Sequence, residues 1–251
     1  MINPFPALGK ALRDLFDEFL LLLVCNLVWS LLSLPLWVFA FIVLQAGAPL
    51  AASAIVLLGV LPAGPATIAL ALVAHRITDG RATSVGDYFR AMRQHARLGW
   101  LLTGLGVGGL LVILLNFGFY LGVNNIFGGL MLGLWLYLLI FWLGLMLYAF
   151  PLAFLQEEPG LRMIARNAFL MTVGRPVFTV ITLLLMGILL LISAYLLVPA
   201  LFITIAFLSV WSSRAARALI ADARRRREEA ESAPTTAPVE EKGRKGQVRP
   251  K

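Results

Sequence analysis

Few residues in this sequence combine the types and the spacing that catalysis or metal binding requires. His75 and His95 could meet in the fold, but two histidines without partner ligands make a weak metal site. Glu157-Glu158 could act as an acid–base pair, but Pro159-Gly160 follows directly and is typical of a solvated turn. The sequence contains no P-loop, no Gly-x-Ser-x-Gly and no His-Glu-x-x-His pattern. We therefore predict a protein that is not an enzyme, with no catalytic residue, no metal site and no cofactor.

The elements that must position any site are long apolar segments. Three blocks, residues 19–75, 98–156 and 176–213, contain no Asp, Glu, Lys or Arg, and the whole chain is 60% hydrophobic and 14% charged. A helix needs about 20 residues to cross the hydrocarbon core of a bilayer, so each block can hold two crossings. The predicted fold class is an all-α, polytopic integral membrane helix bundle. Because ionisable residues inside a membrane usually mark ion or proton paths, their absence argues against proton-coupled transport.

Uncharged turns divide the three blocks into six transmembrane helices, which we expect to form three hairpins. All 21 Lys and Arg residues lie outside the blocks. Cytoplasmic loops carry the excess of these residues, so we predict a multi-pass cell-membrane protein with both termini cytoplasmic. Residues 1–213 form the predicted transmembrane domain, and residues 214–251 form a basic helical extension with a disordered tail from residue 224. The predicted spans cover residues 19–44, 49–75, 99–123, 127–154, 176–197 and 199–213.

A short cytoplasmic amphipathic helix precedes each predicted hairpin. In residues 5–19, 83–99 and 160–175, apolar positions recur at helical spacing, and Ser84 is a predicted N-cap. We expect such helices to lie in the plane of the membrane interface. The apolar positions are Leu8, Leu12, Leu15 and Phe19, then Val85, Tyr88, Phe89 and Met92, then Leu161, Ile164, Ala168 and Met171.

Two prolines, three residues apart, lie within the second predicted span. Pro65 suits the first position of a helix, and the residue before a proline is biased away from helical geometry. We therefore expect separate helical pieces over residues 49–61 and 65–79, with a break at membrane depth. One alternative is a kink packed against neighbouring helices, with Thr67 satisfying a freed carbonyl. The other is a half-helix that starts at Pro65, after a break at Gly64, and offers its amides to an anion, as in discontinuous transporter helices.

Glycines four residues apart recur in the third and fourth predicted spans. Small residues at this spacing let membrane helices approach closely, so we expect packing within the chain, with homo-oligomerisation as the alternative. The glycine pairs are Gly104 and Gly108, Gly118 and Gly122, and Gly129 and Gly133.

The C-terminal region is strongly basic, with four consecutive arginines at residues 224–227 and a sequence isoelectric point near 10.2. In a membrane protein such charge favours anionic lipid in the bilayer. We therefore predict contact of the cytoplasmic face with anionic lipid and no nucleic-acid binding.

Three stretches carry a family resemblance: NLVWSLLSLPLW (26–37), GPATIALALVAHRITDGRATSVGDYFRAMRQHARLG (64–99) and LRMIARNAFLMTVGRPVFTVITLL (161–184). Together they resemble the YesL family, bacterial integral membrane proteins grouped around a domain of unknown function. One departure is an extra apolar stretch of about 25 residues from Trp37 to Leu61, where the family pattern is shorter. The resemblance implies an accessory role linked to carbohydrate uptake, because genes of this family often lie beside carbohydrate-uptake genes.

Two functions therefore remain open from the sequence. The first is a non-enzymatic accessory protein that binds a partner, such as another membrane transport protein, through its cytoplasmic helices. The second is a small channel or facilitator-type transporter for a small molecule, sensitive at the helix break formed by Gly64, Pro65 and Thr67. Aromatic and basic residues are favoured at interface hot spots. The candidate partner-binding residues are Tyr88, Phe89, Arg90, Arg93, Arg162, Arg166 and Asn167.

Overall fold

The computed structural model describes residues 3–156, 160–197 and 199–232, and within these ranges every regular element is a helix. Six helical segments are long and apolar enough to cross a membrane, which confirms the predicted class of helical integral membrane protein. The helices are α1 (Phe5–Asp17), α2 (Phe19–Gln45), α3 (Pro49–Thr78), α4 (Val85–Gln94), α5 (Ala96–Leu121), α6 (Ile126–Leu155), α7 (Leu161–Gly174), α8 (Pro176–Leu196), the π-helical η1 (Ala200–Thr204) and α9 (Ile205–Ser232).

The bounds of the first five predicted spans agree with α2, α3, α5, α6 and α8 to within three residues at each end. The sixth predicted span, residues 199–213, corresponds to η1 and the start of α9, and α9 continues through the predicted basic helical extension as far as Ser232. The predicted disordered tail therefore begins too early, since residues 224–232 are helical. The remainder of that tail, residues 233–251, lies outside the described residues.

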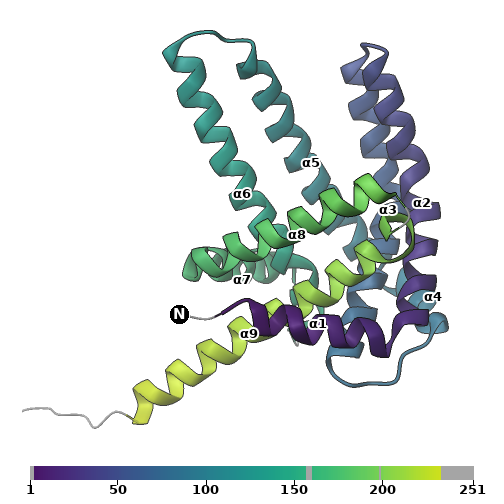
Figure 1. Ribbon diagram of the computed structural model, residues 1–251, viewed down its shortest axis with the longest axis vertical. Helices are drawn as coiled ribbons and strands as arrows, with labels where there is room; N and C mark the ends of the chain where they lie inside the picture. The colour runs from purple at the N-terminus through teal and green to yellow at the C-terminus, as the bar shows by residue number, and fades with distance from the viewer. Residues whose placement is uncertain (1–2, 157–159, 198, 233–251) are drawn as a thin grey trace, which may run out of the picture.

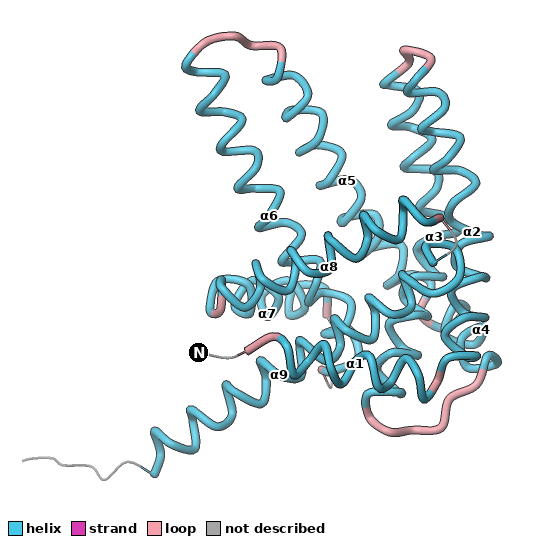
Figure 2. Tube along the Cα trace, viewed as in Figure 1, coloured by secondary structure: helices cyan, strands magenta, loops and turns pink. Residues whose placement is uncertain are grey.

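Two tall helix pairs, α2 with α3 and α5 with α6, rise from a common base (Figure 1). We define the base as the end of the molecule that carries α1, α4, α7 and the basic part of α9. Short uncharged turns, residues 46–48 and 122–125, close the far ends, and the loop at residues 79–84 joins α3 to α4 at the base (Figure 2). Every charged residue that the structure describes belongs to an element of the base, to the loop at residues 79–84, or to a helix end that meets the base.

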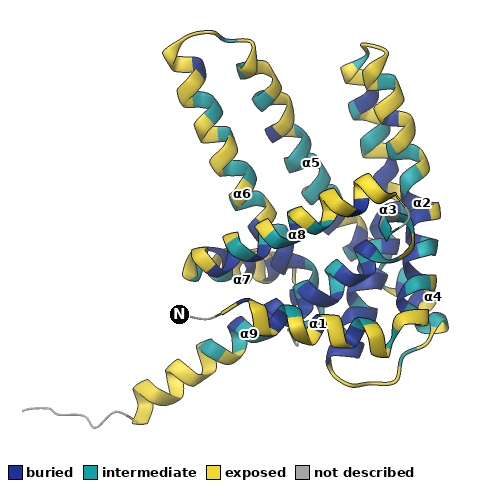
Figure 3. Ribbon diagram, viewed as in Figure 1, coloured by how far each residue is buried: buried dark blue, intermediate teal, exposed yellow. Residues whose placement is uncertain are grey.

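Helix α3 lies at the centre of the base half of the molecule and packs against α2, α4, α5 and α9. Its inner half is rich in alanine, and Ala63, Ala66 and Ala69 are fully buried. Small side chains on several faces allow several helices to approach one helix closely. Figure 3 shows that buried residues concentrate in this half, whereas the outer halves of both helix pairs are mostly exposed or half-buried.

The glycines that allow close helix crossings are not those that the four-residue spacing indicates. A Cβ atom on Gly99 would lie 2.5 Å from the Gly64 carbonyl oxygen, and one on Gly109 would lie 2.2 Å from the Trp142 ring. By contrast, a Cβ on Gly108 or Gly133 would meet nothing within 4 Å. Of the six glycines only Gly104 approaches another helix, since its Cβ would lie 3.8 Å from Val60 of α3. Close packing within the chain through glycine pairs is therefore wrong, and homo-oligomerisation stays the untested alternative.

Helix α8 does not run alongside the two tall pairs but crosses them obliquely (Figure 1). Near its start, the Thr179 hydroxyl lies 2.9 Å from that of Tyr148 in α6. Beyond its end, the Leu201 carbonyl accepts a hydrogen bond of 2.8 Å from Asn26 in α2. Tyr148 and Asn26 each lie seven residues from the base end of their helix, about 10 Å along its axis. Thr179 and Leu201 therefore each lie about 10 Å above the base end of a neighbouring helix, and the end of α8 itself lies further from the base than its start (Figure 1).

The turn between α8 and α9 is held by Asn26. Its Nδ2 donates to the Leu201 carbonyl, and its Oδ1 accepts from the Ala206 amide, each at 2.8 Å. The Ser30 hydroxyl donates to the same carbonyl at 3.0 Å. Irregular backbone at membrane depth is tolerated only where protein satisfies its polar groups. Asn26 and Ser30 meet this requirement for η1, and α9 then packs against α1, α3 and α6.

Candidate functional site

The base end of α3 carries a partly buried polar cluster. Arg217 of α9 lies 2.7 Å from the Asp79 carboxylate and donates to the Thr78 hydroxyl at 3.0 Å. Its other contact is the His75 ring, with Nη2 3.1 Å from Nδ1. The Thr78 hydroxyl also lies 3.0 Å from that of Ser213. This cluster ties α9 to α3 with charge-assisted hydrogen bonds, which are stronger than neutral ones.

Two further ion pairs fasten α9 to other parts of the base. Arg214 donates to both carboxylate oxygens of Asp14 in α1, at 2.6 and 2.7 Å. Asp222 accepts from Arg175, at the joint between α7 and α8, at 2.6 Å. All four side chains are largely shielded from solvent, so the loss of one partner leaves a poorly solvated charge. Arg214 and Asp222, at the start of the basic extension, therefore stabilise the packing of α9 on the base.

Helix α4 begins with the capping box that Ser84 predicts. The Ser84 backbone and hydroxyl donate to the Asp87 carboxylate at 3.0 and 2.9 Å, and Arg76 lies 2.9 Å from it. These hydrogen bonds from Ser84, followed by the Arg76 charge, hold the pKa of Asp87 below its usual value. The cap fixes the orientation of α4, which directs the Tyr88 hydroxyl onto the Ala66 carbonyl at 3.2 Å.

The structure does not bring the seven candidate partner-binding residues together on one surface. Tyr88 is fully buried, and burial raises the pKa of its phenol, so its assignment to a partner surface is wrong. Helices α4 and α7 lie on opposite sides of the base (Figure 1). The residues predicted to form one partner-binding surface therefore lie on two separate surfaces, one on α4 and one on α7. The exposed candidates are Phe89, Arg90 and Arg93 on α4 and Arg162 and Arg166 on α7, with Asn167 half-buried on α7.

His75 and His95 both lie beside the ring of Phe154. The rings of His75 and His95 lie 6.1 and 5.2 Å from that of Phe154, measured between centroids. Within the described part of the chain, no three His, Cys, Asp or Glu side chains gather as metal ligands. Burial lowers the pKa of His95 below its usual value, which favours the neutral ring. The Glu157-Glu158 pair considered above lies outside the described residues.

The helix break expected at Gly64 and Pro65 is absent from α3, which is continuous from Pro49 to Thr78. A proline removes the amide that would bond to the carbonyl four residues earlier, which for Pro65 is that of Leu61. The indole N–H of Trp100 in α5 donates to this carbonyl at 2.8 Å. A side chain from a neighbouring helix therefore satisfies the freed group, and α3 continues through the proline.

The other two residues of the expected break also have packing roles. The Thr67 hydroxyl donates to the Ala63 carbonyl at 2.8 Å and accepts from the Trp29 indole at 2.9 Å. Gly64 lies at the crossing with Gly99, where a Cβ on Gly64 would come within 3.0 Å of the α5 backbone. No helix N-terminus is formed at Gly64, so this segment offers no ring of free amides to an anion.

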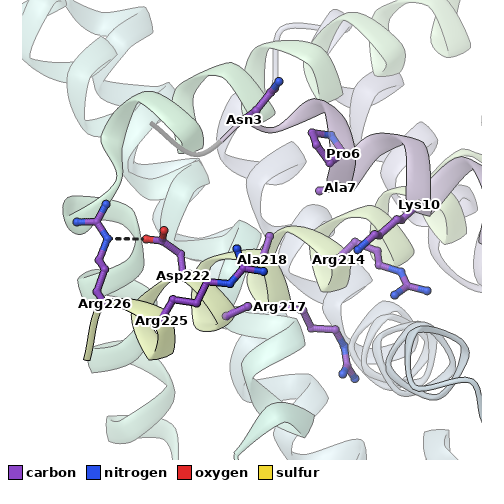
Figure 4. Close-up of a pocket in the computed structure, with 11 residues that line it drawn as sticks. Asn3, Pro6, Ala7, Lys10, Arg214, Arg217, Ala218, Asp222, Arg225 and Arg226 are labelled. Carbon is purple, nitrogen blue, oxygen red and sulfur yellow. Dashed lines mark hydrogen bonds and ion pairs between the residues drawn. The ribbon is translucent and has the colours of Figure 1, made fainter. Parts of the chain in front are cut away.

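Among the cavities formed by the described residues, three lie beside these elements. An apolar one of about 670 Å³ lies between the outer parts of α2, α3 and α5. A second, of about 370 Å³, lies between α5, α6 and α7. The third, of about 580 Å³, lies between α1 and the basic part of α9 and has a lining rich in charged side chains (Figure 4). We call it the α1–α9 cleft, and its charged lining residues are Lys10, Arg214, Arg217, Asp222, Arg225 and Arg226.

Sequence reasoning missed the residues that organise the base. Asp14 and Asp222 were not singled out, and Arg214 and Arg217 were considered only as part of a basic region. One signal was present: Arg214 and Arg217 lie one helical turn apart at the end of an apolar segment, a spacing typical of one helix face. Comparisons with protein-family models, curated proteins and solved structures find no match for this chain.

Proposed function

We propose that this protein is a non-enzymatic accessory membrane protein that binds another membrane protein through the α4 surface, which we define as Phe89, Arg90 and Arg93. Phe89 is 46% exposed and lies one helical turn from Arg93, so an aromatic ring and a guanidinium share one face. Exposed aromatic and arginine side chains of this kind are favoured at interface hot spots.

The observation that carries the proposal is the distribution of acidic partners. All five aspartates form ion pairs with arginines of the same chain. Asp87, the nearest acid to the α4 surface, pairs closely with Arg76 at 2.9 Å, and its contact with Arg90 is longer, at 3.5 Å. Among the described residues Arg93 has no ion-pair partner. An acidic segment of a partner would supply the carboxylates that the α4 surface lacks.

The class of partner and the orientation belong to the same proposal. The resemblance to the YesL family supports a membrane protein of carbohydrate uptake as the partner. The excess of Lys and Arg at the base supports a cytoplasmic base, with both ends of the chain on that side of the cell membrane. The α4 surface would then face a cytoplasmic segment of the partner.

No observation favours the alternative of a channel or facilitator. That alternative depended on a broken helix with free amides, whereas α3 is continuous and Trp100 covers the carbonyl that Pro65 frees. The cavity between the two tall helix pairs is lined almost entirely by apolar side chains, which offer no polar path for a small molecule.

Photo-cross-linking in native membranes tests the proposal. A photoreactive phenylalanine analogue at position 89 should capture one membrane protein, and Arg90→Ala/Arg93→Ala should abolish the product. The matched control, Arg162→Ala/Arg166→Ala, removes the same charge from exposed positions on α7 and should leave the product unchanged. The proposal is wrong if the product persists without Arg90 and Arg93. It is also wrong if no product forms while liposomes with the purified protein pass sugars or anions.

A further inference from the structure

The α1–α9 cleft concentrates positive charge at one place on the base. Five basic side chains line it, together with the carboxylate of Asp222. Three of the five have carboxylate partners within the chain: Arg214 faces Asp14, Arg217 faces Asp79, and Arg226 faces Asp222, which also pairs with Arg175. The remaining two are Lys10 of α1 and Arg225 of α9.

Lys10 and Arg225 have no acidic partner in the part of the chain that the structure describes. Their side chains extend toward one another along the cleft, one from each wall (Figure 4). Both side chains are exposed and face a common space of about 580 Å³, where an anion would be attracted by two unpaired positive charges at once. The charge of this cleft therefore favours an anionic ligand.

The neighbouring face of α1 indicates where the cleft lies. Ala7, Ala11 and Asp14 are buried in the fold, whereas Phe5 and Phe16 are 58% and 75% exposed. A short helix with an exposed apolar stripe beside a charged face lies in the membrane interface, at the level of the lipid headgroups. With α1 at that level, the α1–α9 cleft lies among the lipid headgroups, where phosphate groups are concentrated.

We propose that the α1–α9 cleft binds a phosphate-bearing anion, held by Lys10 and Arg225. Arginine and lysine both bind phosphate oxygens, the first through a planar fork of donors and the second as a point charge. The site does not depend on the α4 surface or on any partner protein. Its phosphate comes either from a lipid headgroup or from a soluble compound, and the two sources are separable by experiment.

The test uses the full-length protein and two probes. Native mass spectrometry measures phosphatidylglycerol adducts against phosphatidylcholine adducts, and calorimetry in neutral detergent measures inorganic phosphate. Lys10→Gln/Arg225→Gln should weaken binding of one or both probes about 30-fold, as two lost charge contacts near a membrane surface imply. Loss of lipid adducts alone identifies a headgroup, and loss of inorganic phosphate identifies a site open to soluble phosphate.

The matched control is Arg224→Gln/Arg227→Gln, which removes the same charge from α9 outside the cleft. It should leave binding unchanged. Equal loss in the control and the cleft variant would show diffuse attraction and overturn the site, as would no loss in either. If the cleft variant fails to fold, Lys10→Arg/Arg225→Lys replaces it. That variant keeps the charge and must keep the binding.

A second inference rests on α8 and η1 and is independent of the cleft. The turn held by Asn26 lies 19 residues before the far end of α2, about 28 Å short of it along the helix axis. Helix α9 returns from there to the base, where Ser213 meets Thr78 at 3.0 Å. We infer that the segment from α8 to α9 enters and leaves the membrane on the same side, so that only α2, α3, α5 and α6 cross it.

Cysteine labelling in intact cells tests this topology. In a Cys25→Ala background, Asn124→Cys at the tip between α5 and α6 should react with a membrane-impermeant maleimide from the outside. Tyr195→Cys, near the end of α8 and 90% exposed, should not react from that side. A nitroxide label on the same cysteine should contact oxygen more readily than a water-soluble relaxant. Labelling of Tyr195→Cys as fast as Asn124→Cys would show that α8 crosses the membrane and would overturn the inference.

Discussion

Arg214 donates hydrogen bonds to both carboxylate oxygens of Asp14, at 2.6 and 2.7 Å, across 200 residues of sequence. This ion pair joins the first described helix to the last one, and with the pairs of Arg217 and Asp222 it makes α9 the element that closes the base. The first turns of the basic part of α9 are therefore fixed to the rest of the helix bundle, and the helix extends beyond the bundle only after them.

Asp14→Ala should destabilise the fold, because it leaves the Arg214 guanidinium shielded from water without a partner. We expect a loss of about 2 kcal/mol in the free energy of unfolding, below the value for a fully buried pair. Thermal unfolding in detergent measures it. Asp17→Ala, which removes the exposed partner of Arg13 on the same helix, is the control and should have almost no effect. Equal effects of the two changes would mean that the Asp14 pair is not structural.

Trp100→Phe should destabilise the fold, because it removes the indole N–H that bonds to the Leu61 carbonyl, which Pro65 leaves without a backbone donor. We expect a loss of about 1 kcal/mol in the free energy of unfolding. In a Pro65→Ala background the backbone amide returns and the same change should cost less, so a double-mutant cycle should show coupling. Trp142→Phe, which removes a bond to a carbonyl that no proline has freed, should show no coupling to Pro65→Ala. Additive effects of Trp100→Phe and Pro65→Ala would contradict this account of the continuous helix.

Gly99→Ala should separate α3 from α5, because its Cβ would lie 2.5 Å from the Gly64 carbonyl oxygen. Overpacking of this kind costs about 1–3 kcal/mol. The matched control on the same helix is Gly108→Ala, whose Cβ meets open space and should be tolerated. Denaturation of both variants in mixed micelles checks the difference, and equal stability would refute the close crossing.

His95 should make the fold less stable at mildly acidic pH. Its pKa is lowered by burial, so the folded state holds the proton less tightly than the unfolded state, whose pKa is about 6.5. Its contribution is therefore fully present above that value and is lost as the pH falls toward the folded pKa. Melting temperatures of the wild type and His95→Gln at pH 7 and pH 5 test this. An unchanged difference between the two pH values in the variant would exclude His95 as a cause.

The site was less predictable than the elements that carry it. The cap at Ser84 and the exposure of Arg90 and Arg93 agree with the sequence pattern, because both depend on residues within one or two helical turns. Tyr88 lies on the same short helix, yet it is buried because α3 brings the Ala66 carbonyl to its hydroxyl. Periodicity identifies the apolar face of a helix, but it does not distinguish a face in lipid from a face in a protein core.

The sequence by itself determined the membrane class and the bounds of the first five long helices, because about 20 apolar residues without charge define a potential crossing wherever they occur. Only the tertiary structure decided how deep each helix lies and what its polar groups meet. The continuity of α3 depends on Trp100, the turn after α8 depends on Asn26, and the place of α9 depends on Asp14. Each of these partners is distant in sequence from the group that it satisfies. Inside a membrane, where water cannot satisfy backbone or charge, such distant partners decide the fold.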